Sequence, residues 1–406
     1  MNKRILFGIA ALAMILSGTQ VFSSPTVTIK APTLTFTGSD ATSNAYAALL
    51  NTAFSSAQFN ATIDSVKTEA ESQLSQYGEQ TKLGNGFGNA NLYSAQSATM
   101  QGYQGYKTFA VMGGGLVGVQ LPSFDINKIS TMFDNMQSDP DIYAGGALSV
   151  TYLNLGINAE TVFGFFNKDL GKSLKNFYFN VKGGGSNVNY EIDSKTTLDM
   201  KSTNFGIGVN YQLFPSSPSI MSGLFKWRGL NVGTGFNYQS NKIDFTLTLD
   251  KITKEMSGSL FTDGTNTINP TATFSVVPKV NVGVDTYTCS IPLEATTSVQ
   301  FLWLSNINFG VGADLVFGST DINAIVDSAV TIDSFSAGAS TPGVTSTTKS
   351  GSASIDASTK GVPPSLVRAR IMTGFGLDLG PLKIDFPIYY YFNSGLAFGL
   401  SAGIVW

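Results

Sequence analysis

Residues 382–406 read LKIDFPIYYYFNSGLAFGLSAGIVW, and apolar side chains occupy nearly every even-numbered position. The odd-numbered positions are mostly charged, polar or small, as at Lys383, Asp385 and Gly399. A period of two over this length predicts two antiparallel β-strands, because successive side chains of a strand point to opposite faces. The run Asn393-Ser394-Gly395 interrupts the alternation and predicts the tight turn between them.

The two faces of this hairpin are inverted relative to those of a soluble barrel. Its bulky face is continuous and ends on Trp406, whereas the opposite face carries Lys383 and Asp385. A small, charged face suits the interior of a barrel, and a bulky apolar face suits the exterior. This inversion is typical of strands that face lipid.

The same alternation recurs upstream, with bulky residues on one face and Gly, Asn, Gln or charged residues on the other. It is clearest over residues 204–213, 230–239, 306–318 and 366–379. Further strands are expected at 108–121, 146–158, 176–192 and about 273–302. We therefore predict an all-β fold, an antiparallel transmembrane β-barrel of about 10–14 strands that occupies residues 106–406. A secreted soluble β-sandwich is the alternative fold.

The predicted connections between strands are of two lengths. The long ones are 122–143, 251–269 and 319–361, and the last is so rich in Ser, Thr, Ala and Gly that a long loop is expected. The short ones are 214–225, 303–305 and 380–381. Counting back from a periplasmic C-terminus over about ten strands places the long connections outside and the short ones in the periplasm, as is usual for such barrels.

Composition narrows the class of protein. Charged residues make up 13% of the 406-residue chain, against about 25% in a typical soluble domain, which indicates much surface that never meets water. A net charge of −3 argues against nucleic-acid binding. Histidine is absent, which excludes catalytic triads that depend on histidine and metal sites that use histidine ligands. We expect no enzymatic activity, no catalytic residue, no cofactor and no metal.

The N-terminal quarter of the chain differs from the rest. Residues 1–23 combine Lys3 and Arg4 with an apolar run and predict a cleaved secretory signal peptide. Residues 24–105 are expected to form a helical plug or a periplasmic segment ahead of the barrel. Amphipathic helices are predicted over about 40–54 and 59–77, and the Gly/Asn-rich run at 83–91 is predicted to be irregular. Polar helices suit a wet lumen, which favours the plug.

With its signal peptide, alternating strands and final strand at 396–406, the chain resembles bacterial outer-membrane β-barrel proteins. The resemblance implies that residues 396–406 act as a C-terminal β-signal for the barrel-assembly machinery, with Trp406 in place of the usual Phe. A narrower resemblance is to the long-chain fatty-acid transporter family, which has a helical hatch before its barrel. The hatch's Asn-Pro-Ala triplet is missing here, and the nearest stretch is Asn89-Ala90-Asn91.

Strand parity predicts which charged side chains point into the lumen. These candidate pore-lining residues are Lys182, Glu294, Asp314, Arg368, Arg370, Asp378, Lys383 and Asp385. They either set the ion preference of a pore or form an ion-pair network that fills a narrow interior. Tyr389, Tyr390 and Tyr391, together with Trp406, are expected to form aromatic girdles at the membrane interfaces.

The sequence supports two hypotheses about function. The leading hypothesis is an outer-membrane channel or transporter for passive uptake of small solutes or hydrophobic, lipid-like compounds, in contact with outer-membrane lipid. The alternative is a surface adhesin, an interaction barrel that displays the 319–361 loop. An open conduit with steady conductance would favour the first, and binding that depends on 319–361 would favour the second.

Overall fold

The computed structural model describes residues 26–30, 32–53, 81–96, 108–121, 145–219, 224–257, 261–263, 266–268, 270–336, 343–393 and 395–406. The predicted signal peptide, the helix at 59–77 and the connection at 122–143 lie outside these residues.

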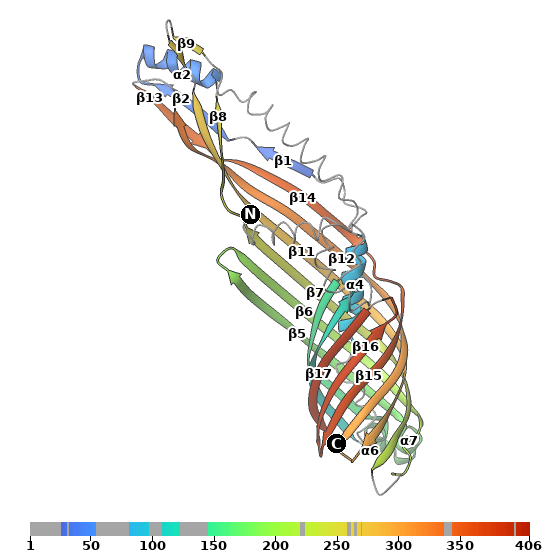
Figure 1. Cartoon of the computed structure of the whole chain (residues 1–406). Coiled ribbons are helices and arrows are strands. Elements are labelled where there is room, and N and C mark those ends of the chain that lie inside the picture. The colour runs from blue at the N-terminus through green and yellow to red at the C-terminus, as the bar shows by residue number, and fades with distance from the viewer. Residues whose placement is uncertain are drawn as a thin grey trace.

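Within the described residues, ten antiparallel strands close a ring (Figure 1). In order around the ring they are β3 (Phe109–Gln120), β4 (Gly145–Asn158), β5 (Phe177–Asp193), β6 (Thr196–Phe214), β7 (Phe225–Thr248), β11 (Thr271–Phe301), β12 (Ser305–Ser336), β15 (Val367–Leu379), β16 (Leu382–Tyr391) and β17 (Gly395–Val405). The ring closes where β17 pairs with β3, from Gly395 opposite Gln120 to Val405 opposite Ala110. The predicted antiparallel barrel is confirmed.

The side chains of the barrel wall alternate as the sequence predicts. Outward positions are apolar and exposed, as at Phe309, Phe375 and Phe398, whereas inward positions are polar and buried, as at Asn308 and Asn237. Each strand of the ring has a hydrogen-bonded neighbour on both sides, so the backbone groups along these ladders are paired without water. An apolar exterior around a polar interior is the arrangement that lipid requires.

The two ends of the barrel differ. One end carries the 302–304 and 380–381 turns, the C-terminus, and two short helices between β4 and β5, α6 (Ala159–Phe166) and α7 (Lys168–Ser173). We call it the turn end. At the opposite end β11 and β12 continue far beyond the rim as one antiparallel ladder that reaches from Phe301–Ser305 to Thr271–Ser336.

Further strands join β11 and β12 beyond the rim, and we call the whole assembly the projecting sheet (Figure 1). β14 (Gly351–Val362) pairs with β12, β1 (Thr26–Lys30) pairs with β14, and β8 (Ile252–Ser257) pairs with β11. At the tip, β2 (Thr33–Gly38) pairs with β13 (Val344–Lys349), and α2 (Ala41–Ala53) packs beside them. The short strands β9 (Phe261–Asp263) and β10 (Asn266–Ile268) form a small hairpin.

The prediction of a long loop over 319–361 is therefore wrong. Residues 319–336 continue β12, and most of the remainder forms β13 and β14. The alternation that marked the barrel strands fades here, and the segment is held as strands by the backbone hydrogen bonds that its neighbours supply. The connection at 251–269 likewise contains β8, β9 and β10.

The N-terminal region contains a second difference from the sequence-based prediction. The expected helix near 40–54 is present as α2, but residues 83–91 belong to the helix α4 (Thr81–Ser94) rather than to an irregular segment. Glycine and asparagine disfavour a helix in isolation, so the surroundings of α4 must stabilise it. Among the helices that the structure describes, none is long and apolar enough to cross a membrane.

The strand β11 provides a direct test of which surface faces lipid. Leu293 lies outward in the barrel part of β11, and Val277 lies exposed in the part that belongs to the projecting sheet. We expect Leu293→Arg to lower the free energy of unfolding by about 2–4 kcal/mol, because a charge on the lipid face is costly near the middle of the bilayer. Val277→Arg should change it by less than about 0.5 kcal/mol. Urea titration in lipid vesicles measures both, and equal effects would show that the wall does not face lipid.

Candidate functional site

Helix α4 lies inside the barrel. Its side chains are almost all buried, and Asn89, Ala90, Asn91, Leu92, Tyr93 and Ser94 have no exposed surface. The helix contacts strands on opposite sides of the ring, including β3, β4, β11, β12 and β17. A helix that touches opposite walls lies between them, and Figure 1 shows α4 in the mouth of the barrel beneath the projecting sheet.

Glycines on the helix and on the wall allow this close fit. A Cβ at Gly118 of β3 would lie 2.3 Å from the carbonyl oxygen of Ala90, closer than any real contact. On the other side of the helix, a Cβ at Gly84 would lie 2.8 Å from the Cβ of Val362. The glycines at 113–118 therefore serve packing within β3: Gly118 admits the backbone of α4, and Gly113 and Gly114 lie against the neighbouring strands β4 and β17.

Asparagines of α4 hold the helix to the rim. Near its N-terminus, Asn85 Nδ2 donates to the carbonyl oxygen of Pro363 at 2.7 Å, and the backbone N–H of Ser365 donates to Asn89 Oδ1 at 2.9 Å. One turn later Asn91 Nδ2 donates to the carbonyl oxygen of Gln239 at 3.0 Å, and Asn241 Nδ2 donates to Asn91 Oδ1 at 2.5 Å. These bonds reach β7 as well as the start of β15, so they fix the helix from two sides.

Tyr93 joins the helix to the wall through three kinds of contact. Its ring stacks on that of Tyr391 with centroids 3.9 Å apart, and its hydroxyl donates to Gln120 Oε1 at 2.6 Å. The guanidinium of Arg368 lies 5.7 Å from the centre of the Tyr93 ring and donates to the same Gln120 oxygen at 3.0 Å. Stacking and cation–π contacts are stronger when water is excluded, as it is here.

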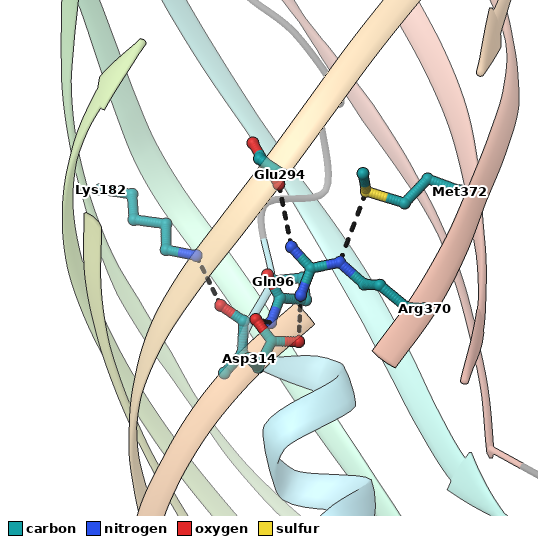
Figure 2. Close-up of polar contacts among 7 residues, drawn as sticks. Gln96, Lys182, Glu294, Asp314, Arg370 and Met372 are labelled. Carbon is teal, nitrogen blue, oxygen red and sulfur yellow. Dashed lines mark hydrogen bonds and ion pairs between the residues drawn. The ribbon is translucent and has the colours of Figure 1, made fainter. Parts of the chain in front are cut away.

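A cluster of charges lies just beyond the C-terminal end of α4 (Figure 2). Arg370 donates to Asp314 and, at 2.9 Å, to Glu294 Oε2, and its Nε lies 3.4 Å from the sulfur of Met372. On the helix side, Gln96 Nε2 donates to Asp314 Oδ1 at 3.3 Å.

Lys182 completes this cluster from the opposite wall by donating to the carbonyl oxygen of Ala95 at 2.5 Å. Two cations and two carboxylates thus face one another, and Arg370 and Asp314 are fully buried. Buried charges are tolerated when they are paired in this way. The cluster joins four strands of the wall, β5, β11, β12 and β15, to the residues that follow α4.

A second polar group lies at the turn end. Arg228 donates to Asp378 Oδ2 at 2.5 Å, Gln300 Nε2 donates to the same oxygen at 3.2 Å, and Lys383 lies 3.8 Å from Asp378 Oδ1. A cavity of about 600 Å³ opens here, and Trp303 contributes to its lining. In the part of the chain that the structure describes, no group of three or more His, Cys, Asp or Glu side chains is placed to hold a metal ion.

The structure places all eight candidate pore-lining residues on the inner side of the wall. Four of them meet in the Arg370 cluster: Lys182, Glu294, Asp314 and Arg370. Asp378 and Lys383 meet at the turn end. Arg368 lies against Tyr93 of α4, and Asp385 is buried inside the barrel. Sequence reasoning missed Gln120, Gln96 and Arg228. Strand parity assigns Gln120 to the lumen, whereas Gln96 lies outside the strands, and Arg228 points inward only because the register of β7 shifts between Trp227 and Leu230.

The expected girdle of Tyr389, Tyr390 and Tyr391 is corrected by the structure. Tyr389 and Tyr391 are buried inside the barrel, and Tyr390 alone of the three points outward. The parity that assigned Lys383 and Asp385 to the lumen assigns these two tyrosines to it as well, so the signal was present in the sequence. Their inward rings form part of the surface that receives Tyr93.

Comparison with known families gives one assignment. The family model described as Lsa36-like matches residues 35–406, which include the plug helix and the whole barrel. This chain belongs to the Lsa36-like family. The range matched in this Lsa36-like chain begins within β2, so it also takes in α2 and the tip of the projecting sheet. No curated protein matches the sequence.

Several solved structures share the general architecture at very low sequence identity. The translocator domain of the autotransporter NalP from Neisseria meningitidis is 8% identical over 74% of this chain and 88% of its own, with a TM-score of 0.27. The toluene transporter TbuX of Ralstonia pickettii is 8% identical over 79% and 97%, with a TM-score of 0.23. A FadL homologue of Pseudomonas aeruginosa is 9% identical over 79% and 98%, also at 0.23. At such scores the function must be inferred from this chain's own residues.

Removal of Arg370 tests whether paired charge holds the lumen together. We expect Arg370→Met to lower the free energy of unfolding by about 3–5 kcal/mol, because Asp314 is left buried without its cation. The double variant Arg370→Met/Asp314→Leu should recover most of that loss, since it removes both charges. Urea unfolding in lipid vesicles measures each variant.

A matched control is the exposed ion pair between Lys195 and Asp250. Lys195→Met should cost less than about 1 kcal/mol. If the double variant at Arg370 and Asp314 is as unstable as the single one, charge pairing is not what stabilises the cluster.

Proposed function

We propose that this protein is an outer-membrane β-barrel that displays the projecting sheet at the cell surface, where the sheet contacts a macromolecular partner. The observation that carries the proposal is the continuation of β11 and β12 beyond the rim, with β1, β8 and β14 paired alongside them. A wall needs strands only as long as the bilayer is thick, about 9–11 residues. The 31 residues of β11 and the 32 of β12 far exceed that length.

The orientation follows from the connections. The two connections that contain β8 to β10 and β13 to β14 leave from the projecting end, and bacterial barrels have their longer connections on the extracellular side, so the projecting sheet faces outward in the proposal. In the proposal, the final strand at 396–406 is the segment that the barrel-assembly machinery recognises during insertion. The apolar outer wall contacts outer-membrane lipid.

The tip of the projecting sheet is built as a folded unit, which suits a role in binding. Leu34, Phe36 and Leu50 are buried together against the end of β11, and the ring of Phe36 lies 4.6 Å from that of Phe335. Asn51 fixes α2 to β2 by accepting from the N–H of Phe36 at 2.9 Å and donating to its carbonyl oxygen at 3.0 Å. A preorganised surface loses less entropy when it binds a partner.

An ion pair supports the sheet near its tip. Lys251 Nζ lies 2.6 Å from Asp333 Oδ2, and Ser275 Oγ donates to Asp333 Oδ1 at 2.7 Å. The hydrogen bonds from Lys251 and Ser275 hold the pKa of the Asp333 carboxyl below its usual range. A lowered pKa means that this contribution to stability is present at neutral pH and is lost as the pH falls through the folded-state value.

Removal of the outer part of the sheet tests the display function. The N–H of Leu249 donates to Pro278 O at 2.8 Å, and Val330 lies opposite Gly351. Short Asn-Gly turns can therefore replace residues 251–276 and 331–350 without disturbing the wall. We expect cells that carry this shortened variant to lose attachment to cultured cell layers and to neighbouring bacteria.

The control for that experiment is assembly of the barrel itself. Both forms should reach the membrane fraction and show heat-dependent mobility on gels, because the ring of ten strands is retained. Equal attachment by the shortened and full-length proteins would reject display as the function.

Transport of small solutes or hydrophobic compounds is the second candidate. The polar lumen and the cavity of about 600 Å³ at the turn end favour it. Because α4 occupies the opposite mouth, such transport would require the helix to move, rather than free diffusion through a standing pore.

Conductance in planar bilayers distinguishes the two candidates. We expect the wild-type barrel to show no steady current, and Tyr93→Ala/Asn91→Ala to show frequent openings, since two of the anchors of α4 to the wall are removed. Tyr46→Ala, the same change in α2 outside the barrel, should leave the current unchanged. A large steady current through the wild-type protein would contradict the plug and support passive uptake.

A further inference from the structure

The N-terminal segment lies beyond the rim, far from the strand that it precedes. Residues 26–30 form β1 and pair with β14, from Thr26 opposite Asp356 to Lys30 opposite Ser352. Residues 33–38 form β2 and pair with β13 at the tip. The segment is thus an integral part of the projecting sheet, on which β13 and the tip cluster depend (Figure 1).

Helix α4 lies in the lumen, with its start at the mouth on the same side as this segment. The start of α4 contacts the rim, where Asn85 bonds to Pro363, and its end reaches the charge cluster, where Gln96 bonds to Asp314. On β12, Thr320 lies opposite Val362 at the rim, and Asp314 lies deeper in the wall opposite Arg368. The helix therefore runs inward from the projecting side.

The first wall strand begins at the other end of the barrel. Thr108 donates to the carbonyl oxygen of Trp406 at 2.8 Å, which places it at the turn end beside the C-terminus. Helix α4 in the lumen therefore lies between an N-terminal segment on the projecting side and a first wall strand that begins at the turn end.

We propose that the barrel carries its own N-terminal segment across the outer membrane and displays it at the cell surface as strands β1 and β2 and helix α2. The activity is self-translocation, in which the lumen is the conduit and residues 26–53 are the cargo. It rests on the outward orientation in the proposed function. After crossing, α4 remains in the lumen and closes it.

The properties of the cargo suit passage through a narrow, charged lumen. Lys30 and Asp40 are the only charged residues within 26–53, and the segment has no cysteine that could form a disulfide beforehand. The free energy for movement in one direction comes from what the segment does outside. There it completes two strand pairings and buries Leu34, Phe36 and Leu50 in the tip cluster.

Cysteine labelling on intact cells tests the proposal with the full chain. In a Cys289→Ser background, single cysteines are introduced at three exposed positions: Ala45→Cys in α2, Ser346→Cys in β13 and Lys168→Cys in α7. Each variant is first checked for heat-dependent mobility. A membrane-impermeant maleimide is then applied before and after permeabilisation of the outer membrane.

We expect Ala45→Cys and Ser346→Cys to label in intact cells to the level seen after permeabilisation, and Lys168→Cys to label only after permeabilisation. Labelling of Ser346→Cys but not Ala45→Cys in intact cells would overturn self-translocation while leaving display of the sheet intact. The reverse pattern, with only Lys168→Cys labelled in intact cells, would overturn the orientation and the proposed function together.

Discussion

The hydrogen-bonded ladder between β11 and β12 is the interaction on which the rest of the molecule depends. Over its inner half it forms part of the barrel wall, with β7 and β15 on either side. Over its outer half it forms the centre of the projecting sheet, with β8 and β14 on either side. One continuous pairing thus ties the part that faces lipid to the part that faces water. A partner bound at the tip would be held rigidly by the barrel.

The lumen is organised by a different physical requirement, the satisfaction of buried polar groups. Inward parity fills the barrel with amide and charged side chains, and these are costly to bury without partners. The asparagines of α4, the stacked Tyr93 and the cluster around Arg370 supply many of those partners. The plug and the wall are therefore complementary, and the helix owes its stability to the barrel rather than to its own Gly/Asn-rich sequence.

Much of the wall could be predicted from the sequence, and the reason is local. The inward position of Lys182, Asp314 or Arg370 follows from its parity relative to bulky neighbours, because a strand alternates its side chains by covalent geometry. Their meeting in one cluster, and the bonds of Lys182 and Asp314 to the residues that follow α4, did not follow from parity. Both depend on contacts between segments that lie far apart in sequence, such as Gln96 and Asp314. Strand parity also assigns Tyr391 to the lumen, where it lies. Its predicted place in an exterior girdle was wrong because parity was not applied to the aromatic residues.

By itself the sequence determined an antiparallel barrel with a lipid-type exterior and charged interior, since a two-residue period over many segments permits little else. Only the tertiary structure decided that residues 81–94 are a helix, that residues 319–361 are mainly strands, and that the N-terminal segment lies beyond the rim. In each of these cases the deciding hydrogen bonds and contacts come from distant parts of the chain. Alternation records which face of a strand is apolar, but it carries no record of which strand or helix lies beside it.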